Sequence, residues 1–210
     1  MEKATGLTTW ALAEGFDVAG VAAAGPSSST AHLGAWLAAG MHGGMAYMAD
    51  TALQRSDPRH LLEGCRSVLM VAMSYHSSAV ASDDPVGGEG RVWISRYAWG
   101  RDYHRIIKKK LIRIGRRLEE TNPGCGWRAV VDTAPLLERE WAARAGLGWI
   151  GKNTMLLNRR FGSELFLGAL LTDLEIPPDQ PVPDHCGRCT ACLDACPTDA
   201  FPAPYLSLIH

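Results

Sequence analysis

Two hydrophobic patterns alternate along the chain, one typical of buried strands and the other typical of amphipathic helices. Continuous apolar runs of strand length predict strands at 17–25, 67–75, 127–132 and 164–172. Helices are predicted at about 5–15, 30–40, 102–119 and 135–145. Strands that alternate with helices favour a core of about 175 residues. We therefore expect an α+β fold, in which a mixed α/β core sheet is flanked by helices.

The helix predicted at 102–119 has the clearest periodicity. Its apolar residues form one stripe of an amphipathic helix at i, i+4, i+7 and i+11, namely Ile107, Leu111, Ile114 and Leu118. The helix at 135–145 would carry Pro135 in its first turn, where a missing N–H matters least. Residues 78–91, rich in Ser, Asp, Gly and Pro, predict an exposed loop.

A proline-rich segment, IPPDQPVPDH at 176–185, predicts a domain boundary. It divides the chain into a larger α/β domain at 1–175, expected to be catalytic and to bind a cofactor, and a small segment at 176–210. The small segment contains a dense cysteine run, so we expect it to be part of a ferredoxin-type iron–sulfur domain.

Composition narrows the class of protein. A chain of 210 residues with 47% hydrophobic and 20% charged residues is typical of a globular protein. A net charge of −1 gives no overall attraction to nucleic acid, so any such binding needs a local basic patch. We find no signal peptide and no apolar run long enough to cross a membrane, and we expect a cytoplasmic protein whose thiols stay reduced.

Four of the six cysteines form the run C-x2-C-x2-C-x3-C-P: Cys186, Cys189, Cys192 and Cys196, followed by Pro197. This spacing is typical of [4Fe–4S] ligands in ferredoxins, whereas structural zinc sites usually pair two separated C-x2-C knuckles. In two-cluster ferredoxins the fourth cysteine serves the other cluster. The chain ends fourteen residues after Cys196. We therefore expect an incomplete ligand set and a missing C-terminal part.

Several motifs resemble epoxyqueuosine reductases of tRNA modification: RSDPR (55–59), ISRYAWGRDYH (94–104), VDTAPLLEREWAARAGLGWIGKNTMLL (131–157) and FGSELFLG (161–168). The resemblance covers essentially the whole chain in the same order. It implies cobalamin and two [4Fe–4S] clusters, and the reduction of epoxyqueuosine to queuosine at the wobble position of tRNA. It also implies a second cysteine run beyond residue 210.

The resemblance also implies roles for individual residues. Asp132 would be the general acid and would lie against the cofactor, together with Arg55, Tyr97, Leu156 and Leu167. Asp132 follows an apolar strand, where desolvation would favour its neutral form. The alternatives are structural: Asp132 or Thr133 could cap the next helix, and the two leucines could be core residues.

A basic helix is the candidate tRNA contact, because residues 101–117 contain eight cations. Such patches bind phosphate without reading sequence. The predicted nucleic-acid contacts are Arg105, Lys108, Lys109, Lys110, Arg113 and Arg139. Arg139 could orient a phosphate or the acid, and its alternative is a surface arginine of its helix. The alternative for the basic helix is a solvated amphipathic helix. Asp102 could act at the site or cap the helix. Lys152 and Asn153 follow the glycine-rich GLGWIG, which would allow a close approach to a ligand.

The leading functional hypothesis is an oxidoreductase, an epoxyqueuosine reductase that takes electrons from a donor the sequence does not identify. One alternative is a corrinoid and iron–sulfur reductase of small molecules, similar to reductive dehalogenases, which would not need the basic helix. Another is a truncated, inactive electron-transfer module. The large α/β part argues against the module, because a cluster alone requires far less protein.

Overall fold

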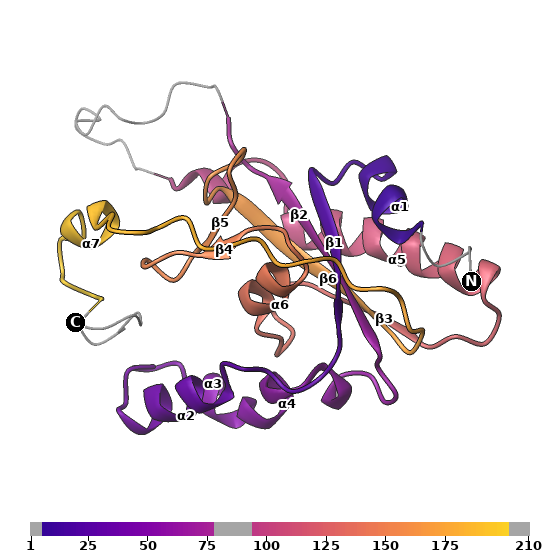
Figure 1. Ribbon diagram of the computed structural model, residues 1–210, viewed down its shortest axis with the longest axis horizontal. Coiled ribbons are helices and arrows are strands. Elements are labelled where there is room, and N and C mark those ends of the chain that lie inside the picture. Colours follow the sequence, from indigo (N-terminus) through magenta and orange to yellow (C-terminus); the bar gives the residue numbers. More distant parts are fainter. Residues whose placement is uncertain (1–5, 78–93, 202–210) are drawn as a thin grey trace.

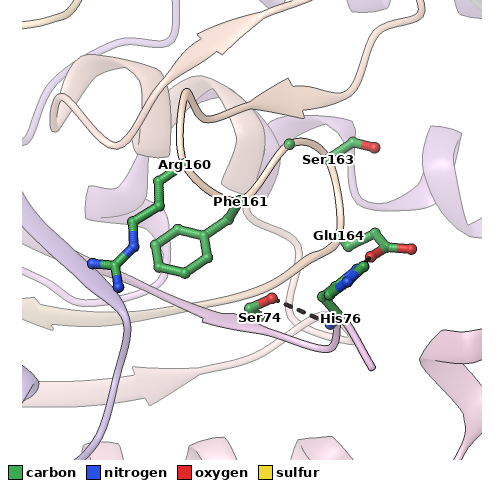
Figure 2. Close-up of a pocket in the computed structure, with 7 residues that line it drawn as sticks. Ser74, His76, Arg160, Phe161, Ser163 and Glu164 are labelled. Atoms are coloured by element: carbon green, nitrogen blue, oxygen red, sulfur yellow. Dashed lines mark hydrogen bonds and ion pairs between the residues drawn. The ribbon is translucent and has the colours of Figure 1, made fainter. Parts of the chain in front are cut away.

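A four-stranded antiparallel sheet forms the centre of the computed structural model, which describes residues 6–77 and 94–201 (Figure 1). Its strand order is β1-β2-β6-β3, with bounds Val18–Ala23, Ser67–Ser74, Leu165–Thr172 and Trp127–Val130. Both β2 and β3 run antiparallel to β6. The ends of β2 and β3 therefore lie at the same end of the sheet as the start of β6, where Ser74 and Glu164 border a cavity (Figure 2).

One face of the sheet is covered by α1 (Leu7–Ala13) and α5 (Tyr103–Thr121). The predicted stripe of α5 is buried against the sheet, which confirms that helix. Gly115 lets α5 approach β3 closely, because a Cβ at this position would lie 2.3 Å from the Trp127 ring. A larger residue would force the helix and the strand apart.

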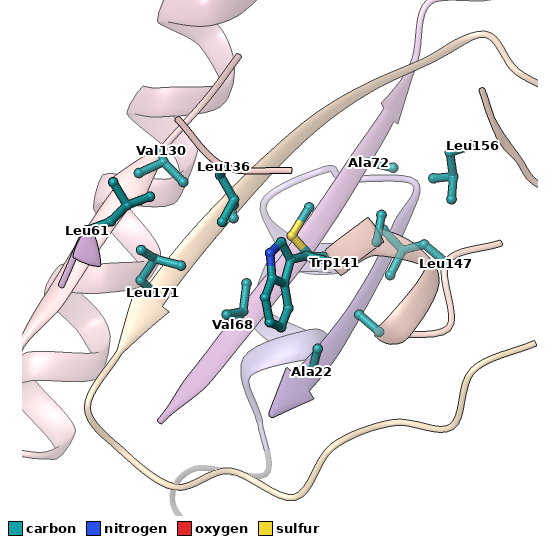
Figure 3. Packing of buried hydrophobic residues seen from close by; sticks show 14 of the residues in the cluster. Ala22, Leu61, Val68, Ala72, Val130, Leu136, Trp141, Leu147, Leu156 and Leu171 are labelled. Carbon is teal, nitrogen blue, oxygen red and sulfur yellow. The ribbon is translucent and has the colours of Figure 1, made fainter. Parts of the chain in front are cut away.

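The opposite face is covered by α6 (Glu138–Arg144), whose Trp141 is fully buried among aliphatic side chains from all four strands of this sheet (Figure 3). A row of short helices lies beside this layer: α2 (Thr30–Ala38), α3 (Tyr47–Asp50), α4 (Ala52–Ser56) and the 3-10 turn η1 (Pro58–His60). The remaining elements are the 3-10 turn η2 (Arg96–Ala98), the hairpin strands β4 (Trp149–Ile150) and β5 (Leu156–Leu157), and α7 (Ala191–Asp194).

The α+β fold class and the four strands are confirmed, but the start of α6 was predicted wrongly. The helix begins at Glu138, and residues 132–137 form turns, so Pro135 precedes the helix and does not lie in its first turn. The carbonyl of Ala134 accepts from Leu136 N at 2.8 Å, and this tight turn replaces the expected first helical turn. The loop predicted at 78–91 lies outside the described residues.

The first part of the predicted linker, residues 176–179, is attached to the sheet. Ile176 is buried, and Asp179 exchanges hydrogen bonds with the backbone of Val21 on β1: its carboxylate accepts from Val21 N and its own N–H donates to Val21 O, both at 2.8 Å. The α7 turn is the single regular element within the described residues 176–201. The ferredoxin-like segment and the two-domain division therefore stay predictions. No helix in the described part of the chain could span a membrane.

Candidate active site at the end of the sheet

Asp132 lies just beyond β3, at the end of the sheet where β2 also ends and β6 begins. Its backbone adopts the left-handed region with a φ of 45°, which aspartate tolerates better than most residues. Its side chain is 54% exposed, so the prediction of a desolvated carboxyl is wrong. The capping alternative is wrong too, because α6 begins six residues later and its N-cap, Leu137, makes no side-chain cap. The side chain is therefore available to a ligand.

His104 joins two carboxylates at this point. Its Nε2 lies 2.8 Å from Asp132 Oδ2, and its Nδ1 lies 2.9 Å from Asp102 Oδ1. The hydrogen bond with Asp132 is the main cause of a raised His104 pKa, and Asp102 adds to it. With both ring nitrogens facing carboxylates, the protonated imidazolium suits the site. Asp102 also caps α5 by accepting from His104 N at 3.0 Å, which is one of the two roles that the sequence left open for it.

An aromatic stack supports this pair from the sheet side. Tyr103 stacks on Phe166 with ring centroids 4.0 Å apart and on His104 at 3.9 Å, and Tyr75 packs on the other side of Phe166 at 4.7 Å. Burial and the nearby charge of Asp132 raise the pKa of Tyr103, which keeps its hydroxyl protonated as a donor. Neither the stack nor the role of His104 was predicted, although the D-x-H spacing at the helix start was a signal for the histidine.

Glu138 is a second carboxyl that sequence reasoning missed. Its Oε1 accepts from the backbone N–H of Asp132 at 2.8 Å and so fixes the turn after β3. Burial raises the Glu138 pKa to about 7, and the charge of Asp132 acts in the same direction. Asp132 therefore has a half-buried neighbour that can hold or release a proton near neutral pH.

Glu138→Gln is expected to stabilise the protein above pH 7. The folded state keeps a proton on Glu138 that the unfolded chain releases near pH 4.5, so stability falls as pH rises from about 4.5 to 7. Glutamine retains the acceptor for Asp132 N and removes this penalty, which is worth about 1–3 kcal/mol. Urea unfolding at pH 5 and pH 8 would measure it. An equal effect at the two pH values would contradict the raised pKa.

The other residues implied as cofactor contacts lie on four separate elements. The positive charge of Arg55, on α4, acts to lower the pKa of Glu138. Burial lowers the pKa of Arg55 itself. Tyr97, on η2, is 55% exposed and lies close enough to Tyr103 to contribute to the raised pKa of Tyr103. Leu156 is buried in the Trp141 cluster, as the core alternative held, and Leu167 packs against that cluster.

Three large apolar side chains on η2 and the β4–β5 hairpin are exposed. They are Tyr97 on η2, Ile150 on β4, and Met155 just before β5. A cobalamin-sized group could cover surface of this kind, because uncovered apolar area is unfavourable in water. The cobalamin contacts stay predictions.

Arg139 and the glycine-rich segment hold the β4–β5 hairpin in place. Arg139 Nη1 donates to Thr154 O at 2.7 Å, which holds the β4–β5 turn. A Cβ at Gly148 would lie 2.1 Å from the carbonyl oxygen of Leu157, so this glycine allows close approach of the chain to itself. Lys152 donates from Nζ to the carbonyls of Gly187 and Cys189 at 2.9 and 2.8 Å.

The cysteine run is therefore attached to the β4–β5 hairpin through Lys152. Trp149 Nε1 donates to Cys186 Sγ at 3.4 Å, and Ala200 N donates to Cys196 Sγ at 3.4 Å. Backbone hydrogen bonds from Thr198 and Ala200 lower the Cys196 pKa. N–H groups aimed at sulfur suit thiolate ligands of a cluster. Within the described residues, no three His, Cys, Asp or Glu side chains are gathered as metal ligands, so the ligand set stays a prediction.

A cavity of about 520 Å³ opens at the same end of the sheet (Figure 2). Glu164 in its wall pairs with His76 and, at 3.0 Å, with Arg96. The carboxylate is thus neutralised by its neighbours, and the His76 interaction lowers its pKa. Its lining comprises Ser74, His76, Arg160, Phe161, Gly162, Ser163 and Glu164.

The predicted nucleic-acid contacts on α5 divide into two groups. Lys110 donates to Gly15 O at 3.0 Å, and Arg113 Nε donates to Glu14 at 2.8 Å, so these two residues tie α5 to the end of α1. Arg105 is 90% exposed, and Lys108 and Lys109 are exposed as well. The second group is therefore better placed than the first to meet a nucleic acid.

Comparison with known proteins gives a consistent result. Residues 55–133 match the family described as epoxyqueuosine reductase QueG, DUF1730. An epoxyqueuosine reductase from Synechococcus sp. (strain RCC307) is 47% identical over 210 residues, covering 98% of this chain and 63% of the relative. Reductive dehalogenase NpRdhA shares the fold at a TM-score of 0.57 and 16% identity.

Two solved structures are closer than the dehalogenase. One, an epoxyqueuosine reductase with a tRNA-Tyr epoxyqueuosine-modified tRNA stem loop, is 31% identical with a TM-score of 0.86. The other, from Bacillus subtilis with its catalytic aspartate loop swung out of the active site, is 30% identical with a TM-score of 0.85. Each covers 96% of this chain, which spans 53% of each solved chain. Over nearly its whole length the chain is therefore similar to epoxyqueuosine reductases, and it spans 53–63% of the length of these relatives.

Proposed function

We propose that this chain carries the active site of an enzyme that reduces epoxyqueuosine to queuosine in tRNA. The observation that carries the proposal is Asp132, an accessible carboxyl on a turn, hydrogen-bonded to His104 and set beside Tyr103 and Glu138. The Bacillus subtilis relative has a catalytic loop, named for an aspartate, that is swung out of its active site. Asp132 is likewise an aspartate on a loop, since it lies on the turn between β3 and α6.

The reaction requires a proton donor at the departing oxygen. Opening the epoxide to an alkene takes up two electrons and two protons, breaks both carbon–oxygen bonds and releases the oxygen as water. Without protonation the oxygen would have to leave as a poor alkoxide. Asp132 would deliver a proton to it, and His104, held between Asp132 and Asp102, would resupply the acid. Tyr103 would orient Asp132 from the other side.

Two cofactors are part of the proposal. The thiolates of Cys186, Cys189, Cys192 and Cys196 would hold iron–sulfur clusters, with the remaining ligands supplied from outside these four residues. Arg55, Tyr97 and the backbone at Leu156 and Leu167 would hold cobalamin next to Asp132. When bound, these groups supply single electrons and a metal centre that acts on the substrate carbon. The electrons come from an external donor.

The tRNA partner is proposed from charge and from a relative. The solved relative holds an epoxyqueuosine-modified tRNA stem loop, and here Arg105, Lys108 and Lys109 are exposed on α5, close to His104. Basic side chains of this kind position a phosphate backbone. Lys110, Arg113 and Arg139 are weaker candidates for contacts with RNA, because each already binds another part of the chain. A tRNA substrate would put the protein in the cytoplasm.

A small-molecule reductase is the alternative, and the fold shared with reductive dehalogenases favours it. That enzyme would not need the exposed cations of α5. A pure electron-transfer module fits less well, because it would have no use for the carboxyl–imidazole pair.

The test is anaerobic reconstitution of the full chain with iron, sulfide and cobalamin, followed by reaction with an epoxyqueuosine-containing stem loop and a chemical reductant. We expect queuosine in the digested RNA. The iron content should fall in Cys189→Ser and stay unchanged in Cys125→Ser, since Cys125 lies outside the run. Dehalogenation of a bromophenol without any queuosine would support the alternative. Zinc in place of iron in all preparations would contradict the cluster assignment.

A further inference from the structure

A groove runs between the first turns of α5 and the strand β3, next to Asp132. It encloses about 490 Å³. Four consecutive residues of the β3 region, 128–131, contribute to its wall. Successive side chains of a strand point to opposite faces of the sheet, so one face alone would contribute only every second residue. Because four consecutive residues line the groove, the strand presents its edge to it. The groove is lined by His104, Arg105, Lys108, Arg128, Ala129, Val130, Val131, Thr133, Ala134 and Pro135.

The charge of the lining is positive. Arg105, Lys108 and Arg128 contribute three cations, and no lining residue is a carboxylate. Arg105 lies 3.4 Å from Asp102, which partly offsets its charge. Arg128 Nη1 donates to Leu61 O at 2.6 Å, which anchors the side chain and leaves its other N–H groups for a ligand. Lys108 has no ion pair or hydrogen bond among the described residues.

Backbone donors add to the cations. Within the described sheet β3 pairs with β6 alone, so one row of its backbone groups faces the groove. Thr133 adds a hydroxyl at the end nearest Asp132. Unpaired backbone N–H groups and cations together favour an extended anionic chain.

We propose that this groove binds the phosphodiester backbone of the RNA strand that carries the nucleoside reaching Asp132. The proposal rests on the proposed function and adds a subsite to it. His104 links the two places, because its ring lines the groove while its Nε2 lies 2.8 Å from Asp132. A strand whose phosphates lie along Lys108 and Arg128 would therefore run directly toward the acid. Sequence reasoning included Arg105 and Lys108 but not Arg128 or the strand edge.

The test compares RNA binding by the wild type, Lys108→Gln and Arg128→Gln, using fluorescence anisotropy with an unmodified anticodon stem loop. Each variant is expected to weaken binding roughly 3- to 10-fold at about 0.1 M salt and to reduce the slope of log K against log salt by about 0.7–0.9. Arg66→Gln is the matched control, because it removes an exposed cation at the start of β2, the opposite end of the sheet. It should leave both quantities unchanged.

Equal weakening by all three substitutions would overturn the subsite, since only net charge would then count. Binding unchanged in Lys108→Gln and Arg128→Gln would overturn it as well. A thermal unfolding curve for each variant separates a misfolded protein from a lost contact. Because the RNA is unmodified, the result does not depend on turnover. Failure of wild-type deoxygenation would contradict the proposed function, whereas normal turnover with unaffected RNA binding would contradict the groove alone.

Discussion

Asp132→Asn is expected to lower the rate of epoxide reduction by about 10²–10⁴, the usual contribution of a general acid. Asparagine keeps an oxygen acceptor for His104 Nε2, so the turn after β3 should persist. It cannot give up a proton to the departing oxygen. A single-turnover assay on the epoxyqueuosine stem loop measures the rate directly, with product formation read from the digested RNA.

Glu120→Gln is the control for Asp132→Asn, because Glu120 is an exposed carboxylate on the last turn of α5, away from the site. Its rate should match the wild type. Iron content and stem-loop affinity should be the same in all three proteins. A full rate in Asp132→Asn would remove Asp132 from the mechanism, and the acid would then have to be sought at Glu138 or Tyr103.

Glu140→Ala is expected to lower the free energy of unfolding by about 3–5 kcal/mol, because it removes a buried carboxylate that accepts hydrogen bonds from several donors. Glu140 accepts from the hydroxyls of Ser27 and Ser28 and from Ser28 N, the last at 2.8 Å. It also pairs with Arg144 at 2.9 Å. The carboxylate thereby fastens the start of α2 to α6, and its loss leaves several donors unpaired.

The pH dependence distinguishes this effect from simple loss of packing. Burial opposes ionisation of Glu140, but hydrogen bonds from the three serines hold its pKa below the usual value. Its stabilisation is therefore present above about pH 4.5 and is lost as pH falls through the lower folded pKa. Urea unfolding should show the deficit of Glu140→Ala at pH 7 and a smaller one near pH 3. Glu120→Ala should change stability by less than about 0.5 kcal/mol.

The site was predictable where its residues lie close together in sequence and not where the fold joins them. Asp132 was identified from its motif, and a cap was one of two roles predicted for Asp102, because capping is a local interaction. His104 lies 28 residues before Asp132, and their contact depends on α5 packing across the end of β3. The desolvated environment predicted for Asp132 was wrong, because the length of the turn after β3, which decides its exposure, does not follow from the apolar run before it.

By itself the sequence determined the four strands, the buried stripe of α5 and the spacing of the cysteines, because periodicity and spacing report on contacts a few residues apart. The tertiary structure decided which carboxyl groups meet. It brought the carboxylate of Glu138 to the backbone N–H of Asp132, and it placed Lys108 and Arg128 along one groove. It also fastened the linker to β1 through Asp179 and Val21. The physical reason is that burial and strand order set the field around each charge, and both depend on residues far apart in the chain.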